Sequence, residues 1–237
     1  MCIPSYHIYP CGDHAVTIEL GNEVAVAVNQ KVLALFYYLS ENTPDGVTDI
    51  IPAYNTLTLV YDVVFLKKSH PAIFVYEHVC AQLQKAVVAI GEEMITVARR
   101  VKIPVCYDAS LAPDLFSLAE SNKLSIEQVI QLHTGKIYRV YMIGFLPGFA
   151  YMGSVDEKII TPRLTQPRVL VPAGSIGIAG EQTGIYPFDS PGGWQLIGQT
   201  PVQMFDAKKE LPCYLQPGDE VQFYAISLGE FTKQKKA

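Results

Sequence analysis

The chain has 237 residues, of which 49% are hydrophobic and 17% charged, and its formal net charge is −5. This length suits one large or two modest domains, and this composition is typical of a well-buried globular core. The 18 Lys and Arg residues are scattered, apart from a terminal run at 233–236. Binding to a nucleic-acid backbone is therefore not expected.

The sequence shows no sign of export or membrane insertion. The first residues, MCIPSYHIYPCGDH, contain neither a basic region nor an apolar run, and no stretch approaches the roughly 18 apolar residues of a membrane span. The five cysteines are far apart and form no CxxC pair. This usage is typical of a reducing compartment, so we expect a cytoplasmic protein without disulfides or a zinc site.

The first part of the chain predicts an α+β domain. Strands are expected at 6–9, 15–20, 47–51 and 56–61, because apolar and polar residues alternate there. One helix is expected after a cap at Asn22, and a second is expected to begin at Ser69 or His70, with Pro71, and to end near Ile90. A further strand is expected at 97–103. From residue 15 this order matches the ferredoxin-like βαββαβ motif, which we assign to a domain of residues 1–95.

The pattern changes at Pro104. Two short helices are expected at 112–122 and 125–132, the second with a capping box of Ser125 and Gln128, and no helix is expected after Lys136. Short strands alternate with Gly and Pro thereafter, at 138–142, 169–171, 175–179, 195–197, 202–204, 213–215 and 221–225. This pattern predicts a closed or nearly closed β-barrel, in a second domain of residues 96–237.

Several common catalytic motifs are missing from the sequence. No GxxxxGK[ST] P-loop, HExxH or GxSxG occurs, and the spacing of Gly174, Gly177 and Gly180 is not that of a dinucleotide-binding loop. His70 and His78 have only Glu77 near them as a carboxylate ligand, so no metal site is expected. Cys106 has no histidine nearby and is interpreted as a buried, inert thiol.

The stretch 138–205 contains the best candidates for a binding surface. In the turn Phe145-Leu146-Pro147-Gly148-Phe149, the residues either pack as a hairpin corner or form a pocket wall that a ligand can approach closely. Arg163 and Arg168 follow Pro162 and Pro167 directly. Each is either a solvated surface residue or a contact for a carboxylate or phosphate.

A second group of candidates lies at 189–195, with His133 further upstream. The backbone at Gly192-Gly193 can form an anion-binding nest, and Gln195 can recognise an amide edge. Trp194 is either a core residue, which is favoured, or a stacking wall. His133 ends a predicted helix, where it is either favoured by the helix dipole or acts as a proton carrier at the mouth of the barrel.

Several segments together resemble one known family. They are GDHAVTIELG, IIPAYNTLTLVYD, IPVCYD, GFLPGFAYMG, TPR, QPRVLVPAGSIGIAG, IYPFDSPGGWQLIGQTP and the late PGD. This combination, spread over nearly the whole chain, is similar to the family of the 5-oxoprolinase B subunit, also called the KipI or allophanate hydrolase subunit 1 family. The resemblance implies a small α+β domain followed by a cyclophilin-like β-barrel.

The resemblance also implies a function. Members act with a KipA-type C subunit, and with a LamB/YcsF-type A subunit, to open 5-oxo-L-proline to L-glutamate, using ATP with Mg²⁺. This chain is expected to be inactive alone and to bind the nucleotide jointly with its partner. An alternative implied by the same family is a regulator that inhibits autophosphorylation of a sporulation-type histidine kinase. A prolyl isomerase is disfavoured, because fold alone does not carry function.

We assign candidate roles on this basis. His133, Arg168 and Gln195 are predicted to be catalytic. The predicted contacts to substrate or nucleotide are Phe145, Pro147, Gly148, Arg163, Pro172, Gly174, Ser190, Pro191, Gly192, Gly193 and Trp194. No metal ligand is predicted within the chain.

Overall fold

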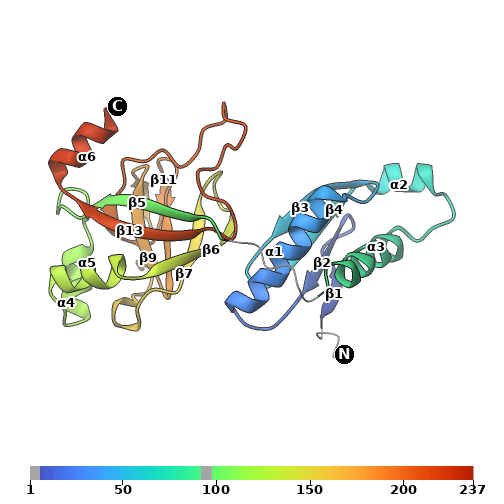
Figure 1. Cartoon of the computed structure of the whole chain (residues 1–237), viewed down its shortest axis with the longest axis horizontal. Coiled ribbons are helices and arrows are strands. Elements are labelled where there is room, and N and C mark those ends of the chain that lie inside the picture. Colours follow the sequence, from blue (N-terminus) through green and yellow to red (C-terminus); the bar gives the residue numbers. More distant parts are fainter. Residues whose placement is uncertain (1–5, 92–97, 237) are drawn as a thin grey trace. The chain divides into compact units, whose positions relative to one another are not determined.

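The computed structural model describes residues 6–91 and 98–236 (Figure 1). The chain divides into two compact units, Met1–Val97 and Ala98–Ala237, and each contains its own cluster of buried apolar side chains. The fold is mixed α/β, and each unit is described separately below.

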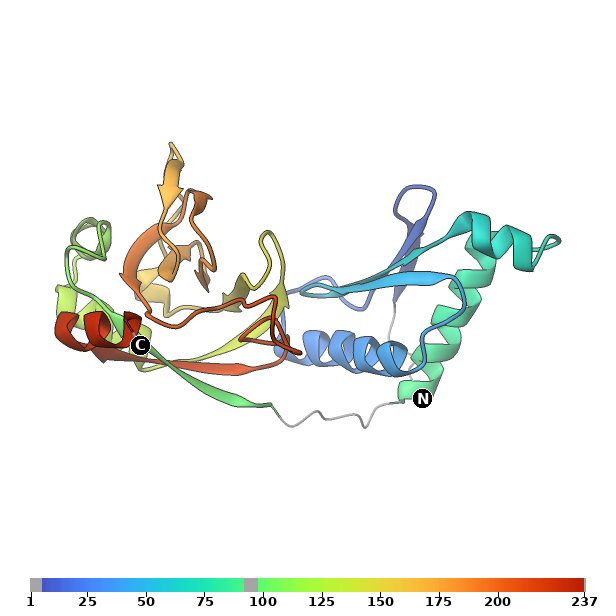
Figure 2. The same ribbon diagram turned by 90° about the horizontal axis from the view of Figure 1, so that it is seen from above.

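Unit 1 is a sheet covered by helices. Its elements are β1 (His7–Pro10), β2 (Ala15–Glu19), α1 (Val26–Glu41), β3 (Val47–Pro52), β4 (Thr56–Tyr61), α2 (Val63–Ser69) and α3 (Val75–Ile90). The strand order is β1-β2-β4-β3, and every neighbouring pair is antiparallel. Figure 2 shows the sheet and α1 as two layers, and α1 and α3 contact each other as well as the sheet.

The alternation in β4 explains how this core forms. Leu57, Leu59 and Tyr61 are buried, while the residues between them are partly exposed. Because successive side chains of a strand point to opposite faces, these three lie on the face that packs against the helices. Helix α1 contributes Leu35 and Leu39 to the same cluster.

Two expectations about the helices of unit 1 are wrong. Helix α1 begins at Val26 after Ala25, so Asn22 is not its cap. The segment at His70 and Pro71 does not open a helix but separates α2 from α3. Proline disfavours helical geometry in the residue before it and lacks an N–H to donate, so a helix ends here more easily than it continues.

The strand expected at 97–103 belongs to the other unit. Val97 lies outside the described residues, and β5 (Arg100–Cys106) pairs in parallel with β13 (Glu220–Ile226) in the barrel. The sheet position next to β2, which the ferredoxin-like order reserves for this strand, is occupied by β1. The alternation in VARRVKI correctly indicates a strand, but local alternation does not determine which sheet a strand joins.

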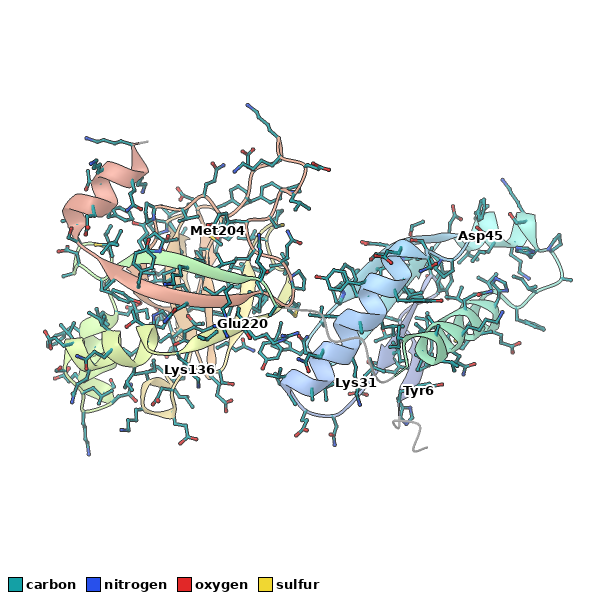
Figure 3. All side chains as sticks on the ribbon, in the orientation of Figure 1. Tyr6, Lys31, Asp45, Lys136, Met204 and Glu220 are labelled. Atoms are coloured by element: carbon teal, nitrogen blue, oxygen red, sulfur yellow. The ribbon has the colours of Figure 1, made fainter. Side chains whose placement is uncertain are left out.

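Unit 2 contains a closed barrel, with the strand order β10-β7-β6-β13-β5-β12-β9 among its described residues. Its further elements are α4 (Leu115–Ser121), α5 (Ile126–Thr134), β6 (Ile137–Ile143), β7 (Ala150–Gly153), a 3₁₀ turn (Glu157–Ile159), β8 (Arg168–Val171), β9 (Ser175–Ala179), β10 (Gln182–Ile185), β11 (Ser190–Gly192), β12 (Gln195–Gln199), β13 (Glu220–Ile226) and α6 (Leu228–Lys235). Strands β8 and β11 form a separate two-stranded sheet. The buried apolar cluster of unit 2 contains side chains of the barrel strands, of α4 and α5, and of the loop residue Met204, which is labelled in Figure 3.

The expected barrel is present, but some of its elements differ from the sequence interpretation. The strands expected at 202–204 and 213–215 are irregular, with one isolated bridge between Phe205 and Cys213. Helix α6 contradicts the expectation of no helix after Lys136, and Ser227 and Glu230 form a capping box at its start. The capping box expected at Ser125 and Gln128 is confirmed. No helix in the described ranges is long and apolar enough to cross a bilayer.

Candidate functional site

Four aromatic side chains from two of the family-like segments meet in one cluster. Phe149, Tyr151, Tyr186 and Trp194 have ring centroids 4.8 to 6.5 Å apart, mostly in edge-to-face geometry. Edge-to-face contact places the positive edge of one ring on the negative face of the next, which stabilises a defined arrangement. The cluster therefore fixes GFLPGFAY, IYPF and PGGW against one another.

Close packing of this cluster depends on glycine. A Cβ at Gly184 would lie 3.0 Å from both Phe149 and Trp194, and a Cβ at Gly177 would lie 2.9 Å from the Trp194 Cβ. A Cβ at Gly192 would lie 2.5 Å from the Tyr186 hydroxyl. Ring packing thus requires glycine at these three positions, and this reason is independent of ligand binding.

Arg163 lies on the exposed side of this cluster in a fixed position. Its Cζ lies 6.0 Å from the centroid of the Trp194 ring, within the range of a cation–π contact. The backbone is held on both sides of it: Gln195 Nε2 donates to the Pro162 carbonyl at 3.0 Å, and Leu164 N donates to the Gly193 carbonyl at 2.7 Å. Within residues 6–91 and 98–236, no carboxylate forms an ion pair with Arg163. The described part of the molecule thus presents an uncompensated guanidinium beside a tryptophan.

Arg168, the other predicted arginine, is already paired. Its Nη2 lies 2.5 Å from Oδ1 of Asp114, and its Nη1 donates to the Trp194 carbonyl at 3.5 Å. The other carboxylate oxygen of Asp114 accepts from Leu196 N at 2.6 Å, and Asp114 N donates to the Leu196 carbonyl at 3.0 Å. This largely buried network joins the start of α4 to β12 and β8. Arg168 therefore holds the fold together, and its charge is not offered to a ligand.

Gln195, which is predicted to read an amide edge, uses one of its two amide N–H groups for a bond within the chain. That N–H holds the Pro162 carbonyl. The side chain of Gln195 therefore positions the loop that carries Arg163. Trp194 is 5% exposed, in agreement with the core interpretation that the sequence favours, although Arg163 contacts its face.

The remaining predicted contacts differ in exposure. Phe145 is exposed, and its ring meets Phe149 edge-on at 5.8 Å, while Pro147 is also exposed. Gly148, at φ 84°, packs against Met204 and Phe205. Pro172 and Pro191 are exposed and Gly192 and Gly193 are partly exposed, whereas Ser190 is buried and its Oγ has no hydrogen-bond partner among the described residues.

His133 does not lie at a barrel mouth. It is fully buried, stacks on Phe223 at 4.6 Å and contacts Tyr138. Thr183 donates its hydroxyl proton to the Gly177 carbonyl, so its oxygen accepts from His133 Nε2–H at 3.3 Å. Tyr107 then donates its hydroxyl to Nδ1 at 2.7 Å. The imidazole is therefore a neutral core group, and the expected roles as a proton carrier or a charged helix-end residue do not fit this environment.

We expect His133 to make the barrel sensitive to acid. Burial lowers the pKa of His133 from 6.5 to about 3. Between these two pH values the unfolded chain binds a proton at His133 that the folded chain does not. The contribution of neutral His133 to the free energy of unfolding is therefore fully present above pH 6.5, and it is lost progressively as the pH decreases. The expected slope is about 1.4 kcal/mol per pH unit below 6.5. Urea unfolding followed in unit 2 at pH 7.5, 6.0 and 5.0 measures it, and His133 is the only histidine after residue 98.

His133→Phe provides the comparison for this measurement. The variant loses the bonds to Tyr107 and Thr183, so its stability at pH 7.5 is expected to be lower. The relevant quantity is the slope between pH 6.5 and 5.0, which is expected to flatten because the titrating group is gone. Equal slopes in the two proteins would show that His133 is not the group responsible.

Gly174 has a structural role beside this site. Its φ is +81°, and an added Cβ would collide with the Thr200 carbonyl oxygen. Its own N–H donates to the Tyr186 carbonyl at 2.7 Å, and its carbonyl accepts from Thr200 N at 2.9 Å. The turn that it forms connects β8 to β9 and holds the backbone of Tyr186.

Replacing Gly174 with Ala is expected to destabilise unit 2 more than the same change at Gly180. Gly180 also has a positive φ, +58°, but a Cβ there meets nothing within 4 Å. Left-handed backbone geometry alone costs about 1–2 kcal/mol, so Gly180→Ala isolates that cost. We expect Gly174→Ala to cost at least about 2 kcal/mol more, because the carbonyl must move. Similar losses in urea unfolding of the two variants would contradict the collision.

The sequence does not single out three of the residues that build this site. Asp114 lies in an ordinary helix-start context, and nothing local indicates its pairing with Arg168, which is 54 residues away. Tyr151 and Tyr186 lie within the family-like segments but are less conspicuous than the neighbouring Gly and Pro. Burial raises the pKa of both phenols. For Tyr186 a hydrogen bond with the Trp194 backbone, and then the charge of Arg163, partly offset this rise, and for Tyr151 Arg163 alone does so. Both hydroxyls are therefore protonated at neutral pH.

A cavity of about 350 Å³ lies elsewhere in unit 2, lined by residues of 99–101 and 203–216. Two arginines line it, but Arg99 pairs with Asp219 and Arg100 with Glu220. The cavity contains none of the family-like glycines or aromatic residues, so we place the candidate site at Arg163 and Trp194.

In the described part of the chain, no three His, Cys, Asp or Glu side chains gather as metal ligands would. Cys106 is buried, in agreement with its interpretation as a packed thiol.

The barrel and the segments clustered on it define the class of protein. Residues 6–215 match the family model described as "Carboxyltransferase domain, subdomain C and D", and the chain belongs to this family. Within it, the chain is 41% identical to the B subunit of 5-oxoprolinase from Bacillus subtilis, over 98% of this chain and 97% of that protein. It is 38% identical to the same subunit of Escherichia coli O157:H7, over 91% of this chain and 94% of that protein.

Solved structures agree with this assignment. TTHA0988 superposes with a TM-score of 0.77 at 37% identity, covering 90% of this chain but 40% of that one. The present chain thus spans about two fifths of that longer polypeptide. The Kluyveromyces lactis urea amidolyase shares the fold, with a TM-score of 0.71 at 18% identity, over 97% of this chain and 15% of that one.

Proposed function

We propose that this chain is the B subunit of a cytoplasmic ATP-dependent 5-oxoprolinase, which opens 5-oxo-L-proline to L-glutamate. Its partners in this proposal are a LamB/YcsF-type A subunit and a KipA-type C subunit, and the chain is inactive without them. The 37–41% identity to three proteins that are named as the B subunit of 5-oxoprolinase, over more than nine tenths of the chain, supports this assignment.

The observation that carries the proposal is Arg163 on the face of Trp194, without an ion pair in the described part of the chain. The substrate is a five-membered lactam that bears one carboxylate. A guanidinium matches a carboxylate with two parallel N–H···O bonds, and an anion placed there gains more than at an arginine that already holds an acid. We therefore assign Arg163 to the substrate carboxylate. The flat lactam would lie against the aromatic cluster.

Tyr151 and Tyr186 are suited to the lactam carbonyl. Both hydroxyls are protonated at neutral pH, and both lie close enough to Arg163 for its charge to affect their pKa. A phenol that donates to the carbonyl oxygen would orient the lactam and polarise its C=O bond. ATP with Mg²⁺, bound jointly with the partner subunit, would supply a phosphoryl group that activates the lactam carbonyl. Water would add to the carbonyl carbon, the C–N bond of the ring would break with a proton going to the nitrogen, and ADP and phosphate would be released with glutamate.

The fold types of the two domains are also part of this proposal. We propose that residues 96–237 form a cyclophilin-like barrel that carries the site. Residues 1–95 then form a ferredoxin-like domain in which β1 replaces the last strand, since the order β1-β2-β4-β3 is otherwise that of the motif. This domain serves as scaffold and interface.

The test of the function is reconstitution. The chain is mixed with its cognate A and C subunits, and conversion of 5-oxo-L-proline to glutamate is measured with ATP, leaving out each protein in turn. We expect glutamate only when all three are present. Conversion by the purified chain alone would refute the requirement for partners, and undiminished conversion without this chain would refute the function.

A further inference from the structure

The two-stranded sheet of β8 and β11 carries unusually exposed apolar residues. Val169 is 89% exposed and Leu170 is 60% exposed, and Pro172 and Pro191 beside them are exposed as well. We call these four residues the β8–β11 patch. They carry no charge. Val169, Leu170 and Pro191 lie on a pair of strands that is separate from the barrel sheet, and Pro172 directly follows β8.

This exposure is unusual for a folded surface. Val169 and Leu170 are consecutive, so they point to opposite faces of the strand, and neither face is covered at this point. An isolated two-stranded sheet is at best marginally stable in water, and contiguous apolar exposure commonly marks an interaction site. The sheet is nevertheless firmly attached at one end, where Val171 is buried in the aromatic cluster and Arg168 is paired with Asp114.

The β8–β11 patch is also continuous with the candidate site. Arg168, the first residue of β8, donates to the Trp194 carbonyl, and Gly192 of β11 is its partner in register. A protein that covers the patch would therefore come close to Trp194 and Arg163. Such a partner could complete a site for which this chain supplies the carboxylate receptor.

We propose that the β8–β11 patch is the docking surface for the C subunit of the same enzyme, through an apolar surface on that partner. This inference rests on the proposed function. Two observations favour this occupant over a second copy of the chain. The relatives are named as one subunit of a larger enzyme. In TTHA0988 the matching part is 40% of one polypeptide, so a further module is covalently attached to this one.

The test compares two surface changes in the full chain. Val169→Asp combined with Leu170→Asp places two charges in the patch, and Val88→Asp places one on α3 of unit 1, where Val88 is 81% exposed. Affinity for the purified C subunit is measured by calorimetry, and glutamate formation is measured in the reconstituted enzyme. We expect the double variant to bind at least about 30-fold more weakly, because a charge buried unpaired in an interface is costly, while Val88→Asp binds normally.

The outcomes separate the two proposals. All three substituted side chains are exposed, so both variants are expected to melt within about 3 °C of the unmodified chain, since surface changes have small effects. Unchanged affinity and activity in the double variant would overturn the docking surface and leave the function intact. Loss of self-association, with unchanged affinity for the C subunit, would also overturn it. Absence of glutamate with every unmodified protein present would instead count against the function.

Discussion

Replacing Arg163 with Ala is expected to lower kcat/KM for 5-oxo-L-proline by roughly 10- to 100-fold in the assembled enzyme. The reason is the loss of a charge-assisted bond to the substrate carboxylate, which contributes about 1.5–3 kcal/mol. Most of the change is expected in KM, because the carboxylate is present in both ground and transition states. Steady-state glutamate formation over a range of substrate concentrations measures it.

Two comparisons make this prediction specific to Arg163. Arg163→Lys keeps the positive charge but loses the planar fork, and it is expected to recover part of the lost affinity. Lys158→Ala removes a cation from the exposed 3₁₀ turn 157–159 and is expected to leave both parameters unchanged. A KM that is the same in Arg163→Ala and the unmodified enzyme would remove Arg163 from the site.

Replacing Asp114 with Ala is expected to cost about 3 kcal/mol of the stability of unit 2. The carboxylate accepts from both Arg168 and Leu196 N, so its removal leaves a largely buried cation and a buried N–H unpaired. Breaking a buried pair costs about 3–5 kcal/mol, and the lower end applies because the Arg168 side chain is 27% exposed. Urea unfolding, followed by the fluorescence of the single Trp194, reports on this unit.

A double-mutant cycle tests whether the pair accounts for this effect. Arg168→Met removes the cation and keeps most of the side-chain volume. In the double variant no buried charge of this pair remains, so its loss of stability is expected to be at least about 1 kcal/mol smaller than the sum of the two single losses. Asp108→Ala, at an exposed carboxylate in the same unit, is the matched control and is expected to change little. Additive losses would show that Asp114 and Arg168 act independently.

Local patterns in the sequence predict local structure well here. The alternation in TLTLVY, the capping box at Ser125 and the Gly and Pro punctuation of a barrel all correspond to observed elements. Each of these signals depends on neighbours within a few residues. The assignment of VARRVKI to the ferredoxin-like strand order shows the limit, because β5 pairs in parallel with β13, about 120 residues further along the chain.

The candidate site shows the same limit. The sequence indicates that Arg163 and Arg168 are rigid cations, but it cannot distinguish them. The distinction comes from Asp114, which is distant in sequence and neutralises one of the two. The sequence suggests an active role for His133 because histidine titrates near neutral pH, whereas its burial between Phe223 and Tyr107 keeps it neutral. Residue types and local segments indicate which residues are candidates for the site. Contacts between residues distant in the sequence determine the role of each candidate.

The most direct measurement of the central claim is the coupling between two reactions. Glutamate formation and ATP hydrolysis are followed together in the mixture of all three proteins, with this chain and 5-oxo-L-proline each present or withheld. The proposed function predicts that both products appear in about equal amounts, and only when the chain and the substrate are both present. Equal rates with and without this chain, at protein concentrations that support complex formation, would contradict it.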